Sequence, residues 1–147
     1  MNVSRIKLAI AILLLVVGFG GAGAFASDYE GVKVSLIKKA TAAANGQKLA
    51  YATTGKPEVT VAVVEIPPGG DTGWHFHPIP VYAYILSGTI TVEVEGGGQY
   101  DFREGDAILE VINTPHIGSN KGILPVRLVV FYTGAEGEPN TVKVARR

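Results

Sequence analysis

The sequence predicts an all-β fold, a sandwich or barrel of short strands. Beyond residue 30, glycine and proline interrupt the chain at short intervals, and β-branched residues fill the segments between them. Those segments show the period-two alternation of strands and no helical periodicity. The segments most typical of strands are residues 32–36, 59–66, 73–77, 81–86, 89–95, 99–102, 107–112 and 125–132, with short ones at residues 116 and 142–144.

The connections between these segments support the same prediction. The clearest alternation is at residues 89–95, where Ile90, Val92 and Val94 alternate with polar residues, as in a strand with one buried face. Residues 41–46 are rich in alanine but end in Asn45-Gly46, which favours a loop over a helical turn. The sequence shows neither an internal repeat nor a linker, so we expect one domain.

The N-terminal residues 1–26 differ from the rest of the chain. Arg5 and Lys7 precede an apolar run at residues 8–17, and small residues follow as far as Ala24-Phe25-Ala26. This order is typical of a secretory signal peptide. The alternative is an uncleaved membrane anchor, but the run is shorter than the roughly 20 residues that a spanning helix needs. We predict cleavage after Ala26, a periplasmic or secreted protein, and a single domain over residues 27–147.

Composition excludes several classes of partner. The chain has no cysteine, so no disulfide can form in an oxidising compartment. No basic run interleaves with aromatic residues, which argues against nucleic acid. Residues 27–147 contain no long apolar stretch and no basic amphipathic helix, so we expect no stable membrane insertion after cleavage.

The chain has three histidines, His75, His77 and His116, and their spacing suits a metal site. Two residues apart in a strand, His75 and His77 project to the same side, with Cα atoms roughly 6.6 Å apart. Antiparallel closure can bring His116 opposite them. Three imidazoles suit Fe, Zn, Ni or Cu and leave open positions for other ligands. Without a metal, the same histidines would cap the mouth of the barrel or bond to their neighbours.

The residues around these histidines repeat the spacing of two cupin motifs. The first motif, G-x5-H-x-H-x3-E-x6-G, matches Gly69, His75, His77, Val81 and Gly88. The second motif, G-x5-P-x-G-x2-H-x3-N, matches Gly105, Val111, Asn113, His116 and Asn120. Over residues 32–132 the sequence therefore resembles the cupin family, whose fold is a double-stranded β-helix or jelly-roll barrel.

The resemblance implies a divalent transition metal, Fe, Zn, Ni or Cu. In similar cupins the two histidines and the glutamate of the first motif bind the metal with the histidine of the second. His75, His77 and His116 carry over, but Val81 stands in the place of the glutamate. Some cupin-like dioxygenases use three histidines alone. A neutral three-imidazole shell leaves the full charge of the ion, which predicts a small anionic ligand. A metal-free ligand pocket is the alternative.

Other residues receive structural or open interpretations. Val81, Ala83 and Ile85 are predicted to face inward and to line the ligand pocket, which places Tyr82 and Tyr84 on the outer face, where they favour a homodimer. Arg127 is either solvated or an anion-binding group, and the solvated interpretation is favoured because a buried arginine needs a partner. The turn at residues 113–115 leaves the facing of Glu110 open. No catalytic acid, base or nucleophile stands out.

Two functions are consistent with these residues. The first is an exported, metal-dependent cupin enzyme of the oxygenase type, acting on a small organic acid, a diketone or an aromatic compound. In it the histidines would serve only as ligands. The second is a non-catalytic periplasmic cupin that binds a small ligand or assists another protein. The fold alone does not decide between them.

Overall fold

The computed structural model describes residues 34–51, 53 and 55–145, and the predicted signal segment 1–26 lies outside these residues. Within them there is no helix, and therefore none long enough to cross a membrane. Two antiparallel sheets have the strand orders β1-β8-β3-β6 and β5-β4-β7-β2-β9. The strands are β1 (Pro57–Ile66), β2 (His75–Phe76), β3 (Val81–Ser87), β4 (Thr89–Val94), β5 (Gly98–Arg103), β6 (Ala107–Leu109), β7 (His116–Ser119), β8 (Val126–Ala135) and β9 (Val142–Lys143).

The all-β prediction is confirmed, and most strands lie where the alternation placed them. Residues 41–46 form the predicted loop, in which Gly46 has a φ of 87°. The predicted strand at residues 32–36 is wrong over its described part, because residues 34–36 belong to no strand. Alternation over so few residues gives a strand only when a neighbouring strand pairs with it.

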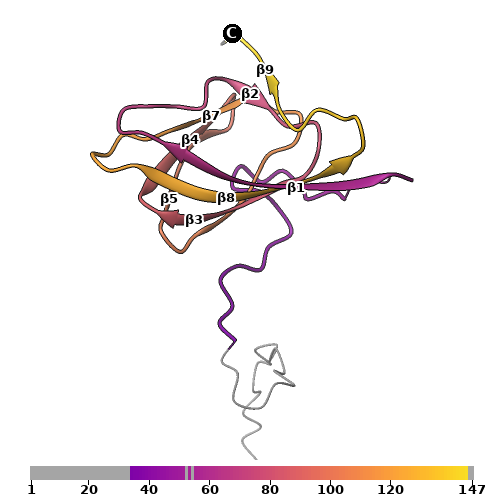
Figure 1. The fold of residues 1–147 in the computed structure, drawn as a ribbon, viewed down its shortest axis with the longest axis horizontal. Helices are drawn as coiled ribbons and strands as arrows, with labels where there is room; N and C mark the ends of the chain where they lie inside the picture. The colour runs from indigo at the N-terminus through magenta and orange to yellow at the C-terminus, as the bar shows by residue number, and fades with distance from the viewer. Residues whose placement is uncertain (1–33, 52, 54, 146–147) are drawn as a thin grey trace, which may run out of the picture. The chain divides into compact units, whose positions relative to one another are not determined.

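The longest pairing joins β1 and β8, which lie side by side although the rest of the domain separates them in the sequence (Figure 1). On the other side of β8 lies β3, with Val81 opposite Tyr132, Ala83 opposite Val130, and Ile85 opposite Leu128. Paired residues of antiparallel strands share a face. The inward residues of β3 and β8 therefore form one continuous row toward the second sheet.

Two residues of the second motif have clear structural roles. Asn113 occupies the position where the family has glycine, and its φ of 53° lies in the left-handed region, which asparagine tolerates better than most residues. Asn120 is buried. Its amide nitrogen donates to the carbonyl oxygens of Ile66 (2.9 Å) and Leu124 (2.8 Å), and its amide oxygen accepts from the nitrogen of Gly122 (2.9 Å). Both residues hold the connections on either side of His116.

Candidate metal centre

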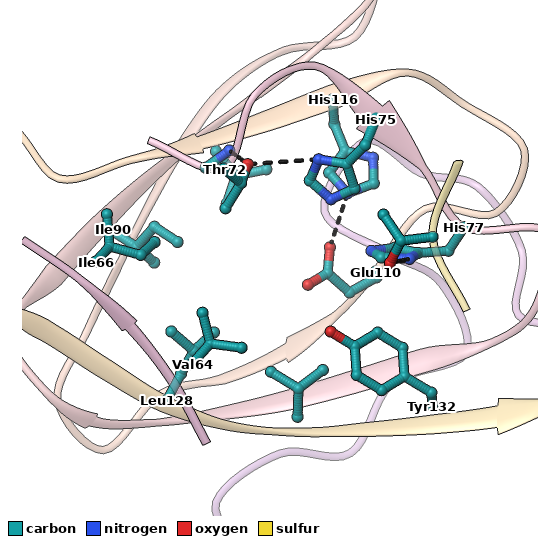
Figure 2. A pocket seen from close by; sticks show the side chains of 14 residues that line it. Val64, Ile66, Thr72, His75, His77, Ile90, Glu110, His116, Leu128 and Tyr132 are labelled. Carbon is teal, nitrogen blue, oxygen red and sulfur yellow. Dashed lines mark hydrogen bonds and ion pairs between the residues drawn. The ribbon is translucent and has the colours of Figure 1, made fainter. Parts of the chain in front are cut away.

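The structure brings the three histidines together on neighbouring strands of the second sheet. His75 on β2 lies directly opposite His116 on β7, and His77 follows β2 and bridges to Ile112. All three are at most 7% exposed. Their ring centroids are 4.4–5.1 Å apart, and one ligand atom of each lies within 4.8 Å of the others. Figure 2 shows the three imidazoles crowded at one end of a cavity.

Each imidazole is oriented through its Nδ1 by a backbone carbonyl. The Nδ1 atoms of His75, His77 and His116 lie 2.8, 2.7 and 2.9 Å from the carbonyl oxygens of Gly73, Asn140 and Thr114. A carbonyl only accepts, so each Nδ1 carries the hydrogen, and in a neutral ring Nε2 is then free to bind a metal. Metal-binding histidines are held in this way.

His116 gives the sharpest test of whether these residues fit a metal. Its Nε2 atom is buried and has no hydrogen-bond partner. A buried polar nitrogen without a partner costs free energy, and native structures rarely leave one in that state. A divalent ion shared with His75 and His77 would satisfy it. The residues therefore fit the divalent metal that the motifs imply.

Glu110, whose facing the sequence left open, points into the same site (Figure 2). Its Oε2 atom lies 3.3 Å from the Nε2 atom of His116, and its side chain is only 12% exposed. A carboxylate therefore lies beside the three imidazoles, one of which it contacts. The available signal was the alternation from the buried residue Ile108, two positions earlier.

The surroundings move the pKa values of these groups in different directions. Burial lowers the pKa of His75 and of His77 below the ordinary value. Burial alone would also lower the pKa of His116, but the neighbouring Glu110 carboxylate outweighs it and raises that pKa. Burial alone would raise the pKa of Glu110, but the adjacent histidines, His116 first, lower it. The site thus favours a charged Glu110 beside His116.

The histidines open into a cavity of about 150 Å³ between the two sheets. We call its polar part the histidine end, which comprises His75, His77, Glu110, His116 and Tyr132. Its opposite part, the apolar end, comprises Val64, Ile66, Ile90 and Leu128 (Figure 2). Thr72, Val92, Gly118, Val130 and Thr141 complete the lining, which contains neither lysine nor arginine.

The predicted pocket residues Val81, Ala83 and Ile85 do not line this cavity. They are buried at 1%, 4% and 0% exposure and belong to the hydrophobic core. They face inward as the alternation predicts, but their β8 partners take the places along the cavity. The structure therefore replaces these three residues in the predicted lining with Leu128, Val130 and Tyr132.

The outward residues lie as predicted. Arg127 is half-exposed and forms an ion pair with Glu65, 3.5 Å between Nε and Oε2, which matches the solvated interpretation. Tyr82 and Tyr84 pair with Phe131 and Val129 on the outer face of the first sheet. That face also exposes Val61 on β1. The predicted homodimer would use this face, and it stays a prediction.

Comparison with known proteins identifies the family. Residues 62–132 match the cupin domain, and solved structures of similar shape have the same fold. Residues 62–132 therefore form a cupin domain, as the two motifs predicted. No curated protein matches the chain closely enough to be called a relative.

Several solved structures share the fold over slightly more than half of this chain. Oxalate decarboxylase from Lactobacillus farciminis, in complex with formate, is 26% identical with a TM-score of 0.50 over 58% of this chain and 26% of its own. The DMSP lyase DddQ from Ruegeria pomeroyi DSS-3 is 23% identical with a TM-score of 0.51 over 58% and 43%. The polyketide cyclase RemF from Streptomyces resistomycificus is 24% identical with a TM-score of 0.51 over 63% and 65%. This chain therefore spans less than half the length of the first two.

Proposed function

We propose that this chain is an exported, metal-dependent cupin enzyme of the oxygenase type that acts on a small organic acid, a diketone or an aromatic compound. One observation carries the proposal. Three buried histidines, with each Nδ1 bonded to a backbone carbonyl, direct their remaining nitrogens into a cavity that is otherwise mostly apolar. Few polar groups in an apolar pocket are typical of a site for a small molecule.

The size of the cavity limits the substrate. Its volume of about 150 Å³ is close to that of an engineered apolar cavity known to hold benzene. A ligand of roughly that size is a short organic acid, a small diketone or a single aromatic ring, whereas a fused aromatic system would not fit. The oxalate decarboxylase that shares this fold carries formate, a small acid, in its structure, which supports the same class of ligand.

The protein residues have separate parts in the proposed reaction. A divalent ion on His75, His77 and His116 would supply a Lewis acid with open coordination positions. Burial, followed by the Glu110 carboxylate, raises the pKa of Tyr132, so its hydroxyl stays protonated at neutral pH and can donate a hydrogen bond to a substrate oxygen. The apolar end excludes water and limits substrate length. A dioxygenase reaction adds both atoms of O₂ to the substrate and needs no external reductant.

Export is part of the proposal and is supported by the order of residues 1–26, a positive start, an apolar run and an Ala-x-Ala site. If this segment is a signal peptide, protein isolated from the native cell envelope begins at Ser27. N-terminal sequencing or intact-mass analysis measures this directly. A protein that retains Met1 would instead favour a membrane anchor.

Oxygen uptake tests the enzymatic proposal. The purified protein is loaded in turn with Fe, Ni, Cu or Zn and mixed with a panel of short acids and diketones, with the His77→Ala variant as the matched control. We expect O₂ consumption that requires both a metal and a substrate and that is absent from the variant. Metal-dependent ligand binding without O₂ consumption would favour the non-catalytic binding cupin. A parent protein that holds no metal would contradict the enzymatic proposal and leave the metal-free ligand pocket.

A further inference from the structure

The first motif lacks its glutamate in this chain, and the structure shows another carboxylate next to that position. The motif places a glutamate where this chain has Val81, which is apolar and 1% exposed. Tyr82 pairs with Leu109 and Ala83 with Ile108 in the register of β3 and β6. The next pair in this register is Val81 with Glu110, and the backbone nitrogen of Glu110 donates to the carbonyl oxygen of Val81 at 3.0 Å.

Residues opposite each other in an antiparallel pair have side chains on the same face and about 4.5–5.5 Å apart at Cβ. A carboxylate at position 110 therefore projects toward the same region as one at position 81. Glu110 lines the cavity, as do the three histidines, whereas Val81 does not. The carboxylate that the motif supplies from β3 is thus available here from the neighbouring strand.

The contact between Glu110 and His116 is better suited to a shared ion than to a direct hydrogen bond. Their Oε2 and Nε2 atoms are 3.3 Å apart, and this Nε2 has no hydrogen-bond partner. A charge-assisted hydrogen bond would be about 2.7–2.9 Å long. Two ligand atoms that are each about 2.0–2.2 Å from one ion lie roughly 2.8–3.1 Å apart at octahedral angles and roughly 3.3–3.6 Å apart at tetrahedral angles.

Among the described residues, those around Glu110 in the cavity also provide no fixed cation. Its side chain is only 12% exposed, and the residues that line the cavity include no lysine or arginine. A buried carboxylate is costly unless it is paired or bound to a metal. The cationic groups of the lining that can pair with this carboxylate are the histidines and any ion they hold.

We propose that Glu110 is the fourth protein ligand of the metal, so the site has three histidines and one carboxylate, delivered from the residue after β6. This inference rests on the metal site of the proposed function and changes its chemistry. The carboxylate reduces the net charge of the bound divalent centre from +2 to +1. It also makes the site more suitable for Mn(II), an ion that prefers oxygen ligands.

Metal binding by a matched set of variants tests this assignment without an activity assay. Glu110→Gln keeps the shape of the side chain and removes its charge, and Glu104→Gln makes the same change at an exposed turn. Mn(II) and Ni(II) affinities are measured by competition, and Co(II) serves as a spectroscopic probe of the ligand set. We expect Glu110→Gln to lower Mn(II) affinity at least about tenfold, and more than it lowers Ni(II) affinity. The Co(II) absorption spectrum should change only in this variant.

A second variant exchanges the two residues across the strand pair. Val81→Glu/Glu110→Val returns the carboxylate to the position of the family motif with little change in volume. We expect it to bind Mn(II) more tightly than Glu110→Gln does, provided that circular dichroism shows the parent fold. Mn(II) binding no tighter than that of Glu110→Gln would contradict a shared ligand position.

The outcomes separate this inference from the proposed function. If the parent and Glu110→Gln bind Mn(II) equally and give the same Co(II) spectrum, Glu110 is not a ligand, and the three-histidine site stands alone. If the parent binds none of these ions, the proposed function fails, and this inference fails with it.

Discussion

The two ends of the cavity are built in different ways. The apolar end lies on β1, β4 and β8, strands of six to ten residues, and burial alternates along most of β1 and β8. The histidine end lies on β2 and β7, which are two and four residues long, on the residue after β6, and on β8. Its imidazoles are oriented by carbonyls of the surrounding connections, those of Gly73, Thr114 and Asn140.

The difference indicates that the two ends of the cavity have different roles. Apolar side chains on long paired strands contribute to stability through buried area, roughly 25 cal/mol per Å². Buried titratable groups on short strands contribute little to stability and have pKa values shifted by burial and by one another. Substitutions at the apolar end should therefore change stability, and substitutions at the histidine end should change metal binding.

The largest expected effect is on metal binding at the histidine end. His77→Ala and His116→Ala each remove one of three imidazoles, so stoichiometric metal should be lost. The thermal unfolding temperature measured without metal should stay close to that of the parent, because a core of this size does not need an ion to fold. Elemental analysis of the purified variants gives the metal content. Equal metal content in the parent and both variants would show that these histidines are not ligands.

The next largest effect is on stability at the apolar end. Leu128 is 4% exposed, and Leu128→Ala should lower the free energy of unfolding by about 2–5 kcal/mol. Metal affinity should stay at the parent value. Leu124, which is 71% exposed, provides the matched control, since Leu124→Ala should change stability by less than about 0.5 kcal/mol. Denaturant titration measures the free energy of unfolding of both variants. A loss of metal from Leu128→Ala would show that the apolar end also affects metal binding.

The sequence predicted these two ends unequally. Alternation placed Ile90 on an inward face, and motif spacing brought His75, His77 and His116 together. The sequence did not identify which inward residues face the cavity, because the lining of a cavity depends on the distance to the opposite sheet. Val81 and Ile85 have the right period, yet they pack in the core. Period two describes one strand, whereas a cavity is a property of two sheets.

The facing of Glu110 was left open for a related reason. It follows the three-residue strand β6 and precedes the turn at Asn113, so the alternation around it is short. Val111 is also buried, which hides the period that begins at Ile108. Only the register of β6 against β3 shows that Glu110 stands across from Val81. That pairing joins residues far apart in the sequence and cannot be inferred from either strand alone.

A smaller effect, tenfold per pH unit, is expected for metal affinity in acid. Burial alone lowers the pKa of His116, but Glu110 raises it above its ordinary value of 6.5, so His116 takes up a proton first as the pH falls. Burial lowers the pKa of His75 and His77, which therefore stay neutral to lower pH. Protonation removes a ligand. Metal affinity should be constant above the pKa of His116 and should fall about tenfold per pH unit below it.

Competition titrations between pH 8 and pH 5.5 measure this dependence, with a metal chelator whose own protonation is known. A slope near one in log affinity against pH indicates that a single proton is displaced. A slope near three from the start would mean that the three imidazoles titrate together. The structure gives the three imidazoles different surroundings, so it predicts a slope near one.

The smallest effect concerns Tyr132, a residue of the histidine end on the same strand as Leu128 of the apolar end. Its ring lies on β8 in the row that continues to Leu128, and its hydroxyl reaches the histidine end (Figure 2). Burial and then Glu110 raise its pKa, so at neutral pH it is a hydrogen-bond donor.

In Tyr132→Phe the ring remains, and stability and metal affinity should match the parent. The affinity of the metal-loaded protein for formate should fall by the value of one hydrogen bond, about 0.5–1.5 kcal/mol or roughly 2- to 12-fold. Tyr84→Phe, on the outer face of the same sheet, should leave formate affinity unchanged. Unchanged formate affinity in Tyr132→Phe would place the bound molecule away from this hydroxyl, whereas a loss of metal would make Tyr132 part of the metal site.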